Sequence, residues 1–147
     1  MAANFIGPVV DWVIATLQAA TPGLLSAAGV EPFGEFRKSW TGVAINWPPV
    51  AVMPRASDFD PETTSVHTMH GLTIKFGVSS DDPDAIEVAA TVYMKAIDDA
   101  ITQATGTWLA QMSHVHISRH DYGPLFGKDG GFAKFPEMIL EVETYEV

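Results

Sequence analysis

The sequence predicts an α+β domain with a mostly antiparallel sheet of about four to five strands and two main helices packed on it. Residues 8–20 and 82–104 carry apolar side chains at helical spacing, and residues 66–78 alternate apolar and polar side chains as a half-buried strand does. The remaining strand-like segments are not separated by helices in regular alternation, which favours antiparallel pairing. The 147 residues have the usual length of one domain, so we expect a single domain over 1–147.

The first helix is expected over residues 8–20. Pro8 suits a first helical position, and the pair Pro22-Gly23 is expected to end the element. The helix is apolar on more than one side, which suits either complete burial or a sheet on one side and a neighbouring subunit on another. Its apolar run is shorter than the ~20 residues that span a bilayer, so a core helix is expected and no membrane partner.

Short strands are expected in the segment that follows, with residues 41–47 as the best candidate. Residues 50–53 lie between prolines and predict a short edge strand, because proline cannot donate to a β-ladder. Residues 55–64 are polar and are expected to form a mobile loop.

The second helix is expected to begin after Asp82, which can cap it, with Pro83 in its first turn. Its buried stripe is expected to consist of Ile86, Ala89, Ala90, Tyr93, Ile97, Ala100, Ile101 and Ala104. Strands are expected over residues 114–119 and 137–143. Residues 122–134 between them are rich in glycine and predict a second mobile loop.

Composition excludes several classes of protein. Eighteen acidic residues against eight basic ones give a net charge of −10, which argues against direct nucleic-acid recognition, since that depends on neutralising phosphates. The chain has no cysteine, so disulfides and thiolate metal sites are excluded. No nucleophile motif or phosphate-binding loop is present, and the expectation is a protein that is not an enzyme and uses no cofactor.

A metal-dependent enzyme is the first alternative. His114, His116 and His120 fall on a predicted strand, and imidazoles two residues apart can chelate zinc or iron. His67 and His70 are a weaker pair, because residues three apart on a regular strand point to opposite faces. A small-ligand binding module is the second alternative, with a pocket lined by Trp40, Trp47, Trp108 or Tyr122.

Several segments carry a resemblance to a known family. They are the N-terminal apolar helix, the edge segment P-P-V-A-V-M-P, the strand H-G-L-T-I-K-F-G-V, the helix D-D-P-D-A-I-E-V-A-A-T-V-Y-M-K-A-I-D-D-A-I, a glycine-rich loop and the closing strand M-I-L-E-V-E-T-Y-E. Their order resembles that of the tail terminator and tail completion (head–tail joining) proteins of long-tailed bacteriophages. Most of the chain takes part, with residues 21–47 matching least.

The resemblance implies a structural virion protein, assembled in the host cytoplasm and located at the head-proximal end of the tail. Such a protein forms a ring, usually of six copies, that caps the tail tube and meets the head–tail connector protein. The implied partners are therefore other copies of the chain, the tail tube protein and the connector. The resemblance implies no catalytic or metal-binding residue.

A ring needs two different patches that meet head to tail, and edge strands and loops are natural material for them. Aromatic residues on such segments are candidate anchors, although each of them could equally pack into its own core. The candidate interface residues are Val50, Val52, Asp58, Phe59, Phe126, Lys128, Asp129 and Phe132.

Overall fold

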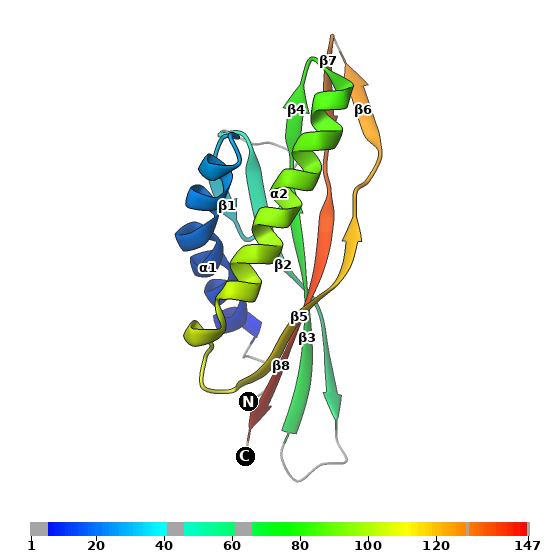
Figure 1. Cartoon of the computed structure of the whole chain (residues 1–147). Helices are drawn as coiled ribbons and strands as arrows, with labels where there is room; N and C mark the ends of the chain where they lie inside the picture. Colours follow the sequence, from blue (N-terminus) through cyan, green and yellow to red (C-terminus); the bar gives the residue numbers. More distant parts are fainter. Residues whose placement is uncertain (1–5, 41–45, 61–65, 129, 147) are drawn as a thin grey trace.

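The computed structural model describes residues 6–40, 46–60, 66–128 and 130–146, and the predicted α+β class is confirmed (Figure 1). Two helices lie on one face of a five-stranded sheet of order β1-β2-β3-β8-β5, and a three-stranded sheet of order β4-β7-β6 continues beyond one end of it. The elements in chain order are α1 (Ile6–Ala27), β1 (Glu35–Arg37), β2 (Pro49–Asp60), β3 (Val66–Phe76), β4 (Val78–Ser80), α2 (Pro83–Gln103), a 3-10 turn (Thr105–Thr107), β5 (Met112–Asp121), β6 (Leu125–Lys128), β7 (Gly131–Lys134) and β8 (Glu137–Glu146).

Helix α2 begins where the sequence predicted. Asp82 is its N-cap and accepts a hydrogen bond from the backbone N–H of Asp84 at 2.9 Å, while Pro83 occupies the first turn. Ile86, Ala90 and Ile97 of the predicted stripe are fully buried. The helix contacts strands of both sheets, so it holds the two sheets together along their length.

Helix α1 is longer than predicted, and the expectation that Pro22-Gly23 ends it is wrong. The helix continues to Ala27, because Leu25 is buried in the core and anchors the last turns. The Thr21 hydroxyl donates to the Leu17 carbonyl at 2.6 Å, a local bond that helps a helix bend around a proline.

Helix α1 ends in a Schellman motif after the core-anchored turns. Gly29 has a φ of 78°, the left-handed conformation that glycine adopts without strain. Its N–H donates to the Ser26 carbonyl, and the N–H of Val30 donates to the Leu25 carbonyl. The C-terminus of α1 is therefore capped about two turns beyond Pro22-Gly23, the pair that was expected to end the helix.

With 22 residues, α1 is long and apolar enough to cross a membrane by length and composition alone. Its apolar stripe is used within the domain, however, since Val9, Val13 and Leu17 are fully buried in the core between the helices and the sheet. Trp12 adds a contact to the 3-10 turn that follows α2, where its Nε1 donates to Thr107 Oγ1 at 3.2 Å. The helix therefore serves this domain as a core helix.

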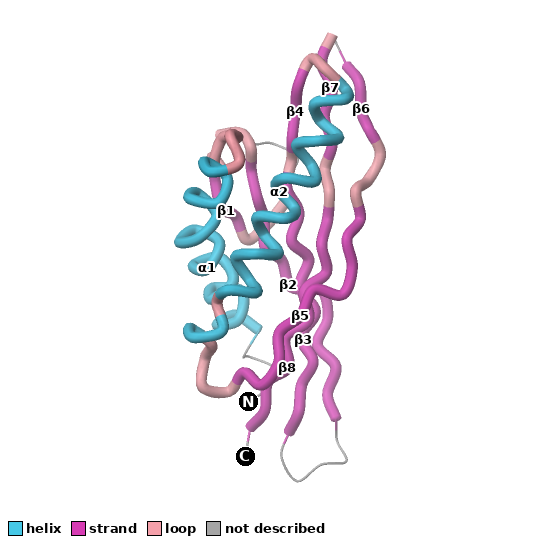
Figure 2. Tube along the Cα trace, viewed as in Figure 1, coloured by secondary structure: helices cyan, strands magenta, loops and turns pink. Residues whose placement is uncertain are grey.

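Three strands of the five-stranded sheet continue into the three-stranded sheet after a short interruption (Figure 2). Strand β3 runs on into β4 past Gly77, β5 runs on into β6 through residues 122–124, and β7 runs on into β8 past Phe135 and Pro136. The order β3-β8-β5 on one side of the break matches β4-β7-β6 on the other. The strands are therefore interrupted at a common level, which opens the sheet there.

Strand β2 corrects two predictions. Residues 50–53 are not a short edge strand, because β2 has 12 residues and pairs with β1 on one side and β3 on the other. The predicted loop at 55–64 is wrong for residues 55–60, which stay in β2 after a bulge between Pro54 and Ala56. Residues 61–65 lie outside the described residues, as do 41–45 of the predicted strand 41–47, whose last two residues form a bend.

The predicted loop at 122–134 is wrong for most of its length. Residues 125–128 and 131–134 form the hairpin β6–β7, in which Lys128 is paired with Gly131. Gly130 has a φ of 82°, as two-residue hairpin turns require. Asp129, beside it, lies outside the described residues.

The predicted alternation of residues 66–78 is confirmed in β3. His70, Leu72, Ile74 and Phe76 are fully buried under the helices, and their neighbours point to the opposite face. Strand β8 alternates in the same way, with Met138, Leu140 and Val142 inward. One face of the five-stranded sheet therefore builds the core, and the other is covered by neither helix.

His70 is a polar side chain on the core face of β3. Its Nδ1 lies 2.8 Å from Ser57 Oγ and its Nε2 lies 3.0 Å from Thr144 Oγ1. Burial lowers the pKa of His70 below its usual 6.5, because desolvation penalises the charged imidazolium.

We expect His70 to make the fold less stable in mild acid. Below pH 6.5 the unfolded chain binds a proton that folded His70 does not bind until its lower pKa is reached. The free energy of unfolding should therefore fall by up to ~1.4 kcal/mol per pH unit in that interval, and His70 should contribute no slope above pH 6.5. Urea unfolding of the wild type and of His70→Gln across this range measures it, since the two proteins differ in no other ionisable group. Parallel stability curves for the two proteins would contradict the prediction.

Candidate functional site

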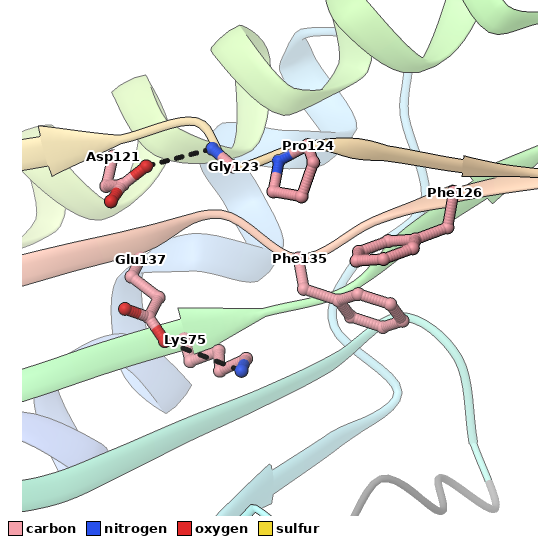
Figure 3. Close-up of a pocket in the computed structure, with 7 residues that line it drawn as sticks. All are labelled: Lys75, Asp121, Gly123, Pro124, Phe126, Phe135 and Glu137. Carbon is pink, nitrogen blue, oxygen red and sulfur yellow. Dashed lines mark hydrogen bonds and ion pairs between the residues drawn. The ribbon is translucent and has the colours of Figure 1, made fainter.

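A hollow of about 370 Å³ lies at the break between the two sheets (Figure 3). It opens where β5 passes into β6 and β7 passes into β8, so that side chains from three neighbouring strands converge on it. The residues that line it are Lys75, Asp121, Gly123, Pro124, Phe126, Phe135 and Glu137.

One wall of the hollow is aromatic. The Phe135 ring lies 5.9 Å from that of Phe126, 5.7 Å from that of Trp40 and 6.2 Å from that of Trp47, between ring centroids. Gly77 makes this cluster possible, because a Cβ at this position would lie 2.7 Å from Trp47 Cζ3. Phe126 stays half exposed at the rim, whereas Phe135 is largely covered.

The other wall is charged. Lys75 Nζ lies 3.4 Å from Glu137 Oε1 and 5.1 Å from the Trp40 ring centroid, so both an ion pair and a cation–π contact hold it. Asp121 Oδ1 accepts a hydrogen bond from the N–H of Gly123 at 3.0 Å, and its other oxygen lies 3.7 Å from Arg119 Nη2. The lining thus holds two carboxylates and one ammonium group.

Beyond the hollow, the uncovered face of the sheet carries paired polar side chains. Glu143 lies 3.4 Å from His67 Nδ1 and accepts from the Ser113 hydroxyl at 3.0 Å, and Glu141 lies 3.0 Å from His116 Nε2. These contacts join β8 to both of its neighbours. The face is therefore polar and ordered by cross-strand pairs.

The structure separates the three histidines of the metal hypothesis. His114 and His116 share the uncovered face, with their ring centroids 4.9 Å apart. A bulge between Ile117 and Arg119 turns His120 to the helix side, where its Nε2 lies 3.1 Å from Asp98 Oδ1 on α2. Among the described residues, no three His, Cys, Asp or Glu side chains are arranged to hold a metal ion.

His67 and His70 point to opposite faces of β3, as their spacing predicted. His70 is paired with Val142 on the core side, and His67 is paired with Tyr145 on the uncovered side. The aromatic residues of the ligand-pocket hypothesis are also dispersed. Trp108 lines a different hollow beside the end of α2, whereas Trp40 and Trp47 pack on Phe135.

The structure divides the candidate interface residues into two groups. Val50 and Val52 are each only 1% exposed and face the core, so these two candidates offer no side-chain surface to a partner. Phe132 is half-buried and packs against the core. Asp58, Phe59 and Phe126 are exposed, so they stay candidates for subunit contacts. Lys128 ends β6, but its side chain and the whole of Asp129 lie outside the described residues.

Sequence reasoning missed the hollow because its walls come from distant segments. One local signal was available: Asp129-Gly130 stands between the matching segments L-F-G-K and G-F-A-K. An Asp-Gly pair between strand-like runs is a strong hairpin signal, and it would have placed Phe126 on a strand. No comparable signal links Trp40, Trp47 and Phe135.

Comparison with known proteins finds a likeness of fold and none of sequence. No protein-family model and no curated protein matches the chain. Among solved structures, the chain is similar to a chain of the "Virion of native gene transfer agent (GTA) particle", with a TM-score of 0.57 and 11% identity. The match covers 91% of this chain and 92% of that chain. At this identity the likeness concerns the fold.

Proposed function

We propose that this protein is a structural virion protein that forms a ring at the end of a phage-like tail, as a tail terminator or tail completion protein. The observation that carries the proposal is the fold likeness to a chain of a gene transfer agent virion, which extends over nine-tenths of both chains. Because fold alone does not fix function, the surfaces of this chain must also suit assembly.

Three features support assembly. The five-stranded sheet has a face that neither helix covers. Within the described part of the chain, β2 beyond residue 51 and the outer side of β5 have unpaired backbone, and a hollow opens where this sheet meets the three-stranded one. Unpaired strand edges can pair with another chain, and exposed aromatic residues such as Phe59 and Phe126 often form subunit contacts. A role in assembly, without catalysis, therefore accounts best for the geometry.

The proposed partners are further copies in a closed ring of six, the tail tube protein below the ring and the head–tail connector protein above it. Each copy offers different patches to its two neighbours, which is the arrangement that closes a ring. The proposed location is the head-proximal end of the tail, after assembly in the host cytoplasm.

Electron microscopy of tail tubes assembled with and without this protein tests the function. We expect tubes of limited length with extra density at one end when the protein is present, and longer uncapped tubes without it. Bovine serum albumin at the same concentration is the control for non-specific effects. Tubes of unchanged length with bare ends, together with a protein that stays monomeric at every concentration in light scattering, would overturn the proposal.

A further inference from the structure

Arg55 differs from the other cations of this chain. Each of the other Lys or Arg side chains that the structure describes lies near a carboxylate: the ion pairs are Arg37–Glu35, Lys38–Asp11, Lys75–Glu137, Lys95–Asp99, Arg119–Asp121 and Lys134–Glu87. Arg55 is exposed and forms no ion pair with any residue within the described ranges. In a chain with a net charge of −10, an exposed guanidinium that has no carboxylate partner among the described side chains is a notable feature.

Arg55 also stands at an open edge of the sheet. Strand β1 pairs with β2 only at residues 49–51, so the rest of β2 is paired on its β3 side alone among the described strands. Arg55 is the residue inserted by the bulge between Pro54 and Ala56. Its Cβ lies 4.0 Å from the point where a Cβ on Gly71 would be, which places it toward the uncovered face.

The hollow has the chemistry to receive a guanidinium. Its lining carries the carboxylates of Asp121 and Glu137 against one ammonium group, and Phe126 offers a half-exposed ring. Arginine binds carboxylates through its planar fork and stacks on aromatic rings, so it can use both walls at once. The contact between Asp121 and Arg119 is 3.7 Å long with both side chains largely exposed, and such pairs are weak enough to be exchanged.

Arg55 and the hollow belong to different strands of the sheet. The carboxylates Glu137 on β8 and Asp121 on β5 are separated from β2 by two and three strand spacings, roughly 10 and 14 Å across the sheet alone. Within one copy no ion pair joins them to Arg55. Arg55 near one edge of the sheet and the carboxylates of the hollow toward the other edge form two different patches. Two such patches can meet head to tail between neighbouring copies.

We propose that the hollow binds the Arg55 side chain of a second copy of this chain, with the guanidinium between Asp121, Glu137 and the Phe126 ring. The inference rests on the proposed function and deepens it, because it names the contact that joins one subunit of the ring to the next. The Arg55 guanidinium of the second copy replaces Arg119 as the cation beside Asp121.

Cross-linking tests the contact directly, since the chain contains no cysteine. Arg55→Cys and Glu137→Cys are prepared separately, mixed, and treated with a short bismaleimide at a concentration where light scattering detects association. We expect a cross-linked dimer in the mixture and at least about tenfold less in either variant alone. A mixture of Lys95→Cys and Glu137→Cys is the matched control, because Lys95 is an exposed cation on the outer side of α2.

Charge reversal gives the second readout. Arg55→Glu should raise the dissociation constant for self-association at least about tenfold, and Glu137→Arg combined with it should restore most of the loss. Lys95→Glu makes the same change in net charge and should alter the constant by less than about twofold. Circular dichroism establishes that each variant is folded.

The outcomes separate this inference from the proposed function. Rings or capped tubes that form without the Arg55–Glu137 cross-link would overturn the inference and leave the function standing. A cross-link without any effect on tail tubes would support the contact and count against the function. A protein that neither associates nor cross-links at any concentration overturns the inference, and the tube experiment then decides the function alone.

Discussion

Replacing Phe76 by Ala is expected to lower the free energy of unfolding by about 3–5 kcal/mol. Phe76 is fully buried at the end of β3 and is among the largest side chains in the core. Its ring lies 6.0 Å from those of Phe33 and Tyr93, between centroids, and Phe33 packs on Tyr93 at 5.2 Å. Alanine would leave a cavity beside the two remaining rings and would loosen the packing of the segment that leads into β1 against α2.

Phe126→Ala is the matched control, because it removes the same side chain from a position that is 51% exposed. Its effect on stability should stay below about 1 kcal/mol. Urea denaturation followed by circular dichroism measures both variants. A loss of less than about 1.5 kcal/mol for Phe76→Ala would mean that the core can collapse around the cavity, and would contradict the packing described above.

Gly34→Ala is expected to lower the free energy of unfolding by about 3 kcal/mol, toward the upper end for overpacking. A Cβ on Gly34 would lie 2.6 Å from the carbonyl oxygen of Asn46 and 2.8 Å from that of Trp47. Both obstacles are backbone atoms, which cannot rotate away as a side chain can. The Gly34 N–H also donates to the Pro48 carbonyl at 2.7 Å, so relief of the clash must break that bond.

The effect of Gly34→Ala should reach the hollow. Displacing residues 46–48 moves Trp47 away from Phe135, which forms part of the aromatic wall. We therefore expect weaker cross-linking between Arg55→Cys and Glu137→Cys in this background. Gly23→Ala is the control, since a Cβ there meets no atom within 4 Å and alanine should stabilise α1 by roughly 0.5–1 kcal/mol. Equal stabilities for the two alanine variants would show that the approach of residues 46–48 to Gly34 is not tight.

Much of the fold could be predicted from local pattern. Helix α2 has its cap, its proline and a continuous stripe within one segment, so no distant residue is needed to define it. Strands β3 and β8 alternate strictly, and one of their faces had to be buried. The errors fall where tertiary contacts outweigh local preference. Burial of Leu25 carries α1 past Pro22, and pairing with β3 extends β2 through a polar segment.

The candidate site was less predictable than the fold. Phe126, for which the sequence left surface and core positions open, is 51% exposed, whereas the candidates Val50 and Val52 lie on the face that the helices cover. The direction of a strand side chain depends on its register, and a bulge reverses it. His120 illustrates the point, because the bulge after Ile117 moves it away from His114 and His116.

The sequence by itself determined the α+β class, the acidic surface, the absence of thiol chemistry, and the second helix with the strands on either side of it. These properties follow from composition and from patterns contained within single segments. Only the tertiary structure decided that Phe126, Phe135 and Glu137 meet Lys75 and Asp121 in one hollow, and that Arg55 stands apart from all of them. The physical reason is that pairing between distant strands sets which side chains become neighbours, and that pairing is chosen by burial across the whole sheet.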